Sequence, residues 1–331
     1  MTGLVRVEAR RFRYRAAVRW LALLAVVAAL AVVAGAWSST RPPSAQAVAD
    51  AREQLAWAQE DWAENGEQYL EDCRAGEAEQ RATDPEVDFG CDEMEPREES
   101  YLPYRTTFAD AAGSWVSGAS MFLLLLAFAA GVTFVTAEIA SGSLSTWLTF
   151  VPRRGRVYAS KVAVAAAGVL VPTALALLVV VGGSWAGAAA NGAAGDVDGR
   201  TWTDLALTAL RVLAVAGAAG AVGAALGFVT RSAAAALGVG VGWLVVVDSL
   251  IAGFLPALQP WTLRVGVQAW VDDGYTAFVS VPCEPLDGVV QNGVCTAERL
   301  VTGVHGGLLL LGATVLLVVV GALVFRRRDV D

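Results

Sequence analysis

The sequence contains little of what catalytic and metal-binding proteins use. Its 331 residues include one histidine, His305, and one lysine, Lys161, and only 17% of the residues are charged. His305 has no evident orienting acid, and Gly182-Gly183-Ser184 lacks the following glycine of a nucleophile turn. No histidine accompanies the four cysteines, which argues against a metal site. We therefore expect no enzyme activity, no cofactor and no bound metal in this chain.

The scarcity of lysine also excludes an ATP-binding P-loop. Such a loop requires Gly-x-x-x-x-Gly-Lys-Ser/Thr, and Ser160-Lys161-Val162 does not supply it. If the protein takes part in an ATP-driven process, the ATPase must be another polypeptide.

Apolar residues dominate instead. They make up 56% of the chain, far from an ordinary soluble composition. Six segments are long enough to cross a bilayer, which takes about 20 apolar residues at a rise of 1.5 Å per residue. The sequence thus predicts an all-α polytopic membrane protein with six transmembrane helices. We place the spans at Ala17–Trp37, Ser114–Thr136, Val162–Ala188, Leu205–Val229, Ala233–Leu255 and Val304–Phe325.

The net charge of −8 hides a division of charge by side. If the six spans alternate, every basic cluster lies on one side, which the positive-inside rule makes the cytoplasm. Both termini are then cytoplasmic. The clusters are Arg6, Arg10, Arg11, Arg13, Arg15 and Arg19, then Arg153, Arg154, Arg156 and Lys161, then Arg231, and finally Arg326, Arg327 and Arg328.

This topology divides the chain into four parts. Residues 1–19 form a basic interfacial lead-in, residues 20–37 the first span, residues 38–113 an outer loop, and residues 114–331 the other five spans. Ala34-Gly35-Ala36 resembles a signal-peptidase site, so a cleaved leader is the alternative for the first span. Its apolar core is longer than in most signal peptides.

The outer loop is acidic, with Asp and Glu outnumbering Arg by about three to one. Its first part, Ala45 to Ala75, is rich in Ala, Glu and Gln and free of Pro, which predicts a helix. An acidic outer surface fits either a cationic ligand or an ordinary solvated face.

A second outer element is expected between the last two spans. Pro256 and Pro260 interrupt the chain there, and Leu263, Val267 and Trp270 then follow at i, i+4 and i+7. This spacing predicts a short re-entrant or interfacial helix.

All four cysteines fall on the outer side, where an oxidising environment favours disulfides. Four cysteines allow three connectivities. Proximity in the sequence favours Cys73–Cys91 and Cys283–Cys295.

Two charged residues fall inside predicted spans. Arg211 lies early in the fourth span and Asp248 late in the fifth, both toward the outer side. Because ionised groups are costly inside a bilayer, such residues face protein or a water-filled path. They can pair with each other, or one of them can contact a substrate.

The stretch from Glu138 to Lys161 is the largest internal segment that reads as cytoplasmic. Leu144, Trp147, Leu148 and Val151 lie at i, i+3, i+4 and i+7, one face of a helix, and Pro152 ends it. Such a helix lies in the membrane surface with its apolar side down. The alternative is a plain basic loop.

These residues carry a family resemblance. Glu138-x-x-x-Gly142, the Leu-rich helix, the Pro-Arg-Arg turn and the Lys that opens the next span resemble the cytoplasmic loop between spans two and three of ABC-2 type transporter permeases. Glu8-Ala9-Arg10-Arg11 is similar to the lead-in of the same permeases.

The resemblance implies the membrane subunit of an ATP-driven exporter in the cell membrane, as in the bacterial plasma membrane. It implies a separate ABC ATPase, a second permease copy or homologue, and lipid as partners, with no nucleic acid. Residues 138–151 would be the coupling helix. Its ATPase-coupling residues would be Glu138, Gly142, Leu144, Trp147 and Leu148, while Arg153, Arg154, Arg156 and Lys161 would hold its far end at the lipid headgroups.

A non-transporting membrane anchor or scaffold is the alternative function, with the acidic outer loop binding an extracellular partner. A gene for an ABC ATPase beside this one favours the permease, and its absence favours the anchor.

The charge pattern makes a direct prediction of topology. A reporter fused at Asp331 should be cytoplasmic, and one inserted near Glu79 should be outside, because basic clusters alternate with acidic loops. Paired alkaline phosphatase and fluorescent-protein fusions measure this. A C-terminus on the outer side would contradict the six-span topology.

Overall fold

The computed structural model describes residues 2–82, 87–150, 153–282 and 294–327. The chain forms two compact units. Unit 1 comprises Met1–Ser38 and Phe108–Asp331, and unit 2 comprises Ser39–Thr107. Each unit is described by itself below.

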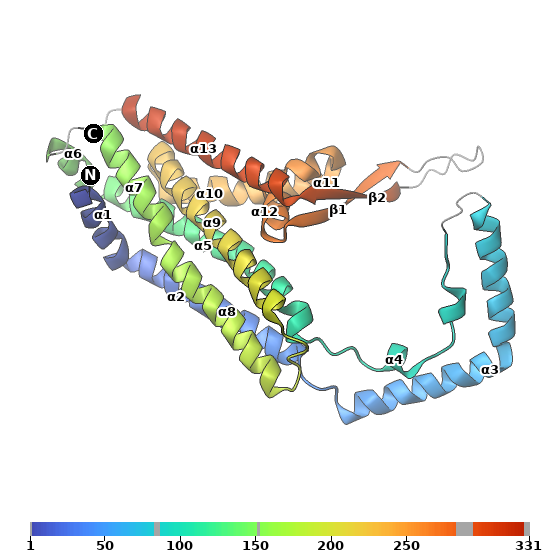
Figure 1. Cartoon of the computed structure of the whole chain (residues 1–331). Helices are drawn as coiled ribbons and strands as arrows, with labels where there is room; N and C mark the ends of the chain where they lie inside the picture. Colours follow the sequence, from blue (N-terminus) through green and yellow to red (C-terminus); the bar gives the residue numbers. More distant parts are fainter. Residues whose placement is uncertain (1, 83–86, 151–152, 283–293, 328–331) are drawn as a thin grey trace. The chain divides into compact units, whose positions relative to one another are not determined.

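Unit 1 is a bundle of membrane-length helices (Figure 1). Six helices in the described part are long and apolar enough to cross a membrane, which confirms the predicted fold class. They are α2 (Ala16–Ser39), α5 (Phe108–Ala140), α7 (Arg154–Gly168) continued by α8 (Leu170–Ala190), α9 (Gly199–Thr230), α10 (Ala233–Gly242) continued by the π-helical η2 (Trp243–Ile251) and by α11 (Ala252–Phe254), and α13 (Gly303–Arg327).

Small residues set the closest helix contact, between α5 and α9. A Cβ added at Gly131 would collide with the carbonyl oxygen of Gly220, and one at Gly223 with that of Phe128. On its other side Gly220 lies against the carbonyl oxygen of Ala165 in α7. Apolar side chains gain little by leaving lipid, so close backbone packing of this kind is what holds membrane helices together.

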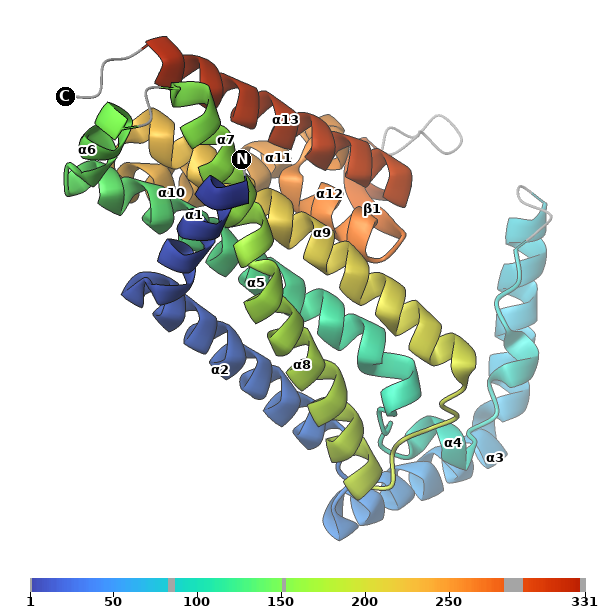
Figure 2. The same ribbon diagram turned by 60° about the vertical axis from the view of Figure 1, so that its left-hand side comes forward.

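Two short helices lie at one end of unit 1, near the end of α13 (Figures 1 and 2). The lead-in forms α1 (Thr2–Tyr14), which packs through Phe12 against Phe134 of α5, with ring centroids 5.1 Å apart. The surface helix α6 (Ser143–Phe150) follows α5 after a tight turn. The predicted basic side of the protein therefore brings α1, α6 and the end of α13 together.

The end of unit 1 that is predicted to face outward holds an unpredicted hairpin beside a predicted helix. The helix is α12 (Leu263–Val271), preceded by η3 (Pro256–Trp261). The strands β1 (Gly274–Pro282) and β2 (Val294–Thr302) pair antiparallel, from Gly274 with Thr302 to Pro282 with Val294. Val267, part of the predicted apolar face of α12, is buried.

Unit 2 consists of the long helix α3 (Ala45–Arg81), η1 (Cys91–Glu93) and α4 (Glu98–Tyr101). The Ser44 hydroxyl caps α3 by accepting from the backbone N–H of Ala47 at 3.1 Å. The predicted helix from Ala45 to Ala75 is present and runs further.

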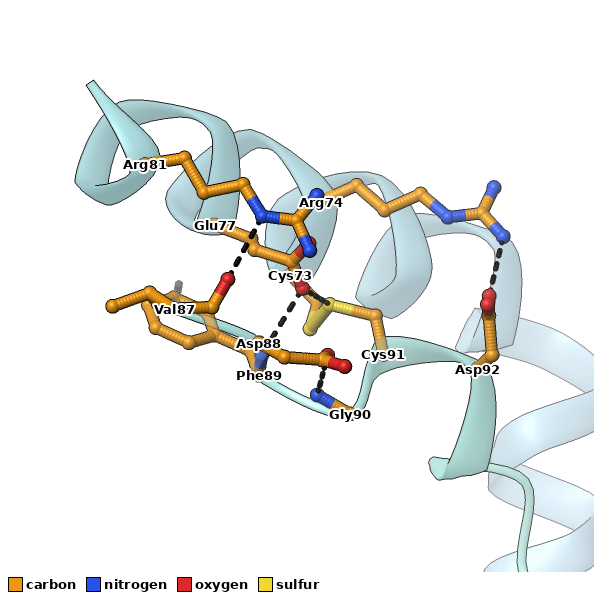
Figure 3. Close-up of a disulfide and its surroundings, with 10 residues drawn as sticks. All are labelled: Cys73, Arg74, Glu77, Arg81, Val87, Asp88, Phe89, Gly90, Cys91 and Asp92. Carbon is orange, nitrogen blue, oxygen red and sulfur yellow. Dashed lines mark hydrogen bonds and ion pairs between the residues drawn. A yellow bond between two sulfur atoms is a disulfide. The ribbon is translucent and has the colours of Figure 1, made fainter. Parts of the chain in front are cut away.

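A disulfide ties the returning chain to the last turns of α3 (Figure 3). Cys73 and Cys91 are bonded, as predicted, with Cα atoms 5.8 Å apart. Around them the Arg74 guanidinium donates to Asp92 at 2.9 Å, and the Glu77 carboxylate accepts from the backbone N–H of Phe89 at 3.0 Å. Cys283 lies outside the described residues, so the Cys283–Cys295 bond stays a prediction.

The α5–α9 contact predicts a sharp difference between two glycines of one helix. Gly131→Ala should lower the free energy of unfolding by about 1–3 kcal/mol, because its methyl group meets backbone that cannot give way. Gly118→Ala is the matched control, since a Cβ there meets nothing within 4 Å. Thermal unfolding of both purified variants in detergent measures the effect. Equal stabilities would contradict the packing described here.

Candidate functional site

The junction of α5, α6 and α7 is built on a glycine turn. Gly142 has φ +67°, a left-handed conformation that favours glycine. The hydroxyls of Ser141 and Ser143 both donate to the carbonyl oxygen of Glu138, each at 3.3 Å. These bonds satisfy a carbonyl group at the end of α5 and set the direction in which α6 leaves it.

Behind this turn lies a buried ion cluster. The Lys161 ammonium donates to Glu8 Oε2 at 2.8 Å and to Glu138 Oε2 at 2.6 Å. The side chains of Lys161 and Glu8 are fully buried, and that of Glu138 is 9% exposed. Lys161 Nζ also lies 4.8 Å from the centre of the Phe134 ring. One ammonium on α7 therefore joins α1 to the end of α5.

Arg11 supplies the second positive charge. Its Nη1 lies 3.8 Å from Glu8 Oε1 and 3.9 Å from Glu138 Oε2, distances that allow ion pairing but exceed those of hydrogen bonds. Its guanidinium carbon lies 4.5 Å from the centre of the Trp147 ring of α6. Arg11 thus links the cluster to α6, and the four formal charges balance.

Arg15 lies beside the cluster and is half-buried. It donates through Nη1 to the carbonyl oxygen of Phe134 at 2.7 Å. Burial lowers the pKa of the Arg15 guanidinium, and the nearby Glu138 carboxylate opposes this effect. Arginine remains charged in proteins, so Arg15 adds to the positive field around the two carboxylates.

Two buried side-chain atoms in this cluster have no hydrogen-bond partner among the described residues. They are Glu8 Oε1 and Trp147 Nε1. Buried polar atoms are almost always paired, and leaving one unpaired costs about 1–3 kcal/mol. Both atoms lie beside Arg11, where α6 meets α1.

The profile of the family described as ABC-2 family transporter protein matches residues 8–330. The chain belongs to this family. No curated protein and no solved structure matches it.

Membership makes the chain the permease component of an ABC transporter, a multi-pass membrane protein that associates with an ABC ATPase. The family is a transport component and not itself a catalytic domain. The match begins at Glu8, so it includes every member of the ion cluster.

In the permease, the predicted coupling residues fall into two groups. Glu138 belongs to the last turn of α5 and enters the ion cluster, whereas Leu144 and Trp147 belong to α6, where Leu144 is buried and Trp147 partly so. Gly142 lies between the two groups. The side chain of Leu148 lies outside what the structure describes.

The basic residues after α6 divide similarly. Arg153 and Arg156 are exposed and Arg154 is partly buried, and their place at the lipid headgroups stays a prediction. The expectation that Lys161 joins them at the headgroups is wrong, because its ammonium is fully buried between two carboxylates.

The two intramembrane charges do not pair with each other as suggested from the sequence. Arg211 pairs with Asp273 at 2.9 Å. The Asp248 carboxylate instead accepts from the backbone N–H groups of Arg264, at 2.8 Å, and Leu263, at 3.4 Å. Each of them therefore fixes α12 or the turn that follows it, and neither reaches the α6 junction.

Glu8 and Arg11 are the members of the site that sequence reasoning did not assign. They were noted only as part of a basic lead-in. The available signal was a single carboxylate among the arginines of residues 1–19, opposite the only lysine of the chain.

The cluster predicts a non-additive response to substitution. Lys161→Met should lower the free energy of unfolding by about 3–5 kcal/mol, because it leaves two carboxylates without their buried cation. The double variant Lys161→Met, Glu8→Gln should regain most of this loss, because the remaining Glu138 carboxylate is then balanced by Arg11. Thermal unfolding in detergent measures both.

Arg10→Met, at an exposed position of α1, serves as the control and should behave as the unmodified protein. A double variant no more stable than Lys161→Met alone would refute the view that charge balance governs this cluster.

Proposed function

We propose that this permease is the membrane-spanning subunit of an exporter, and that α6 is the coupling helix on which a separate ABC ATPase docks. The observation that carries the proposal is the link from α6, through Trp147 and Arg11, to a cluster joining α1, α5 and α7. A push on α6 therefore acts on the ends of three other helices.

The two faces of α6 suit this role. Leu144 is buried on the protein side, while Thr146 and Thr149 are exposed. Both hydroxyls donate to backbone carbonyl oxygens about one turn back, Thr146 Oγ1 to that of Gly142 at 3.4 Å and Thr149 Oγ1 to that of Thr146 at 2.7 Å. This face is polar, short and free to meet a partner protein.

The remaining parts of the proposal concern the assembly. Two permease copies, or this chain and a homologue, form the pathway in the cell membrane, as in the bacterial plasma membrane. Arg153 and Arg156 are exposed beyond α6 and would contact anionic headgroups on the cytoplasmic side. Export is the direction that the resemblance to ATP-driven exporters supports.

The proposal predicts that a bulky charge on α6 removes the ATPase. Thr149→Arg should abolish copurification of the ATPase from native membranes, because the new side chain occupies the docking face. Thr203→Arg in the first turn of α9 is the matched control, since that threonine is also exposed and also bonds a carbonyl one turn back. Mass spectrometry of the purified complexes identifies and quantifies the ATPase.

Loss of the ATPase in the Thr149 variant alone supports docking on α6. Retention in both variants would overturn the assignment of α6. Glu138→Ala is a less direct test of docking, because it also deprives the buried Lys161 of a partner and thereby affects folding.

A further inference from the structure

Arg11 lies between two partners and makes a close contact with only one of them. On one side its guanidinium stacks 4.5 Å over the Trp147 ring of α6. On the other, its Nη1 stops 3.8 Å from Glu8 Oε1, about 1 Å beyond the length of a charge-assisted hydrogen bond. Glu8 Oε1 is the buried oxygen that lacks a hydrogen-bond partner among the described residues.

We infer that Arg11 is a positioning residue that exchanges between these partners and so makes the α6 junction bistable. With α6 packed against α1, Arg11 stacks on Trp147. With α6 displaced, Arg11 moves onto Glu8 Oε1 and Glu138, and Trp147 Nε1 becomes free to bond water. This inference rests on the proposed function of α6 and names the device that lets it move.

Each arrangement makes an interaction that the other lacks. With α6 packed against α1, the contact between cation and ring is made but two buried polar atoms are left unpaired. With α6 displaced, that contact is lost, but Glu8 Oε1 accepts from Arg11 and Trp147 Nε1 donates to water. The ion cluster behind Arg11 keeps its two short bonds, from Lys161 to Glu8 and to Glu138, in both arrangements.

The surrounding charges do not replace Arg11 in this role. Lys161 already donates to Oε2 of both carboxylates. Arg15 is turned toward the carbonyl oxygen of Phe134. Among the charged groups described around the cluster, Arg11 is the one shared with α6, and it belongs to α1. Displacement of α6 therefore leaves the guanidinium next to the carboxylates.

Amide hydrogen exchange of the purified full chain in detergent tests the inference. Trp147→Leu removes the ring and should speed exchange in α6 by roughly threefold to thirtyfold, the range expected from losing a cation–ring contact. Exchange in α1 and α7 should stay the same or slow, because Arg11 then bonds to Glu8. A merely structural role of Trp147 would instead speed exchange in α1, α6 and α7 together.

Two further variants keep the test decisive. Trp147→Phe retains a ring and removes the unpaired N–H, so exchange in α6 should remain within about threefold of the unmodified protein. Arg11→Gln removes the guanidinium that moves between Trp147 and Glu8, and should speed amide exchange in α1 and α6 alike. Unchanged exchange of α6 in Trp147→Leu, or a uniform rise over α1, α6 and α7, would overturn the inference.

This experiment uses the permease without its ATPase. Its failure would therefore leave the copurification result for Thr149→Arg intact, and failure of ATPase docking would leave the exchange result intact. The proposed function and the role of Arg11 can thus be rejected separately.

Discussion

The ammonium group of Lys161 is the point on which one end of unit 1 depends. It is fully buried, and a buried cation is tolerated only when it is paired and hydrogen-bonded. The chain pairs it with Glu8 from α1 and Glu138 from α5, so the lead-in, the second span and the third span are held by one group. Two carboxylates around one ammonium would leave a net negative charge, and Arg11 offsets it from 3.8–3.9 Å. Because Arg11 also stacks on Trp147, the electrostatic requirement of a buried lysine reaches the surface helix α6.

The rest of unit 1 is held together by closer contacts than those of α6. In mid-bundle, α5 and α9 approach until only glycine fits at Gly131 and Gly223. Beside the β1–β2 hairpin, polar contacts fix α12 to its neighbours: Asp248 accepts from its first turn, Gln268 donates to Ser117 of α5 at 2.8 Å, and Trp270 donates to the carbonyl oxygen of Arg211 at 3.1 Å. The contacts of Gln268 and Trp270 join residues 151 and 59 positions apart in the sequence. By contrast α6 is short, exposes Thr146 and Thr149, and meets the cluster through the Arg11–Trp147 contact. An element that moves requires low local stability of this kind.

The sequence predicts features that depend on neighbouring residues better than contacts between residues far apart in the chain. The six spans come from long apolar runs, a property of each segment alone, and they were correct. Cys73–Cys91 was predicted from proximity because a loop of 18 residues leaves few other partners nearby. Lys161 was misplaced because its neighbours Arg153, Arg154 and Arg156 made it look like part of a basic loop, while its partner Glu8 is 153 residues away. The pairing of Arg211 with Asp248 was wrong because Asp273 and the first turn of α12 offered partners whose positions depend on the fold. The β1–β2 hairpin was missed because its strands were read only as a loop carrying cysteines.

The unpaired atoms at the α6 junction are Glu8 Oε1 and Trp147 Nε1, and both lie beside Arg11. A protein selected only for stability would place a partner beside Glu8 Oε1, because Arg11 is already close enough to reach it after a small shift. The Trp147 ring holds Arg11 away, and the indole N–H of that same ring is itself unpaired. Violations of local consistency in natural proteins concentrate at functional sites, where strain is balanced by the need to move or bind. At this junction the violation is confined to the contact between α6 and α1, whereas the bonds of Lys161 behind it are complete. The weak point of the cluster therefore coincides with α6, the helix proposed as the docking site of the ATPase.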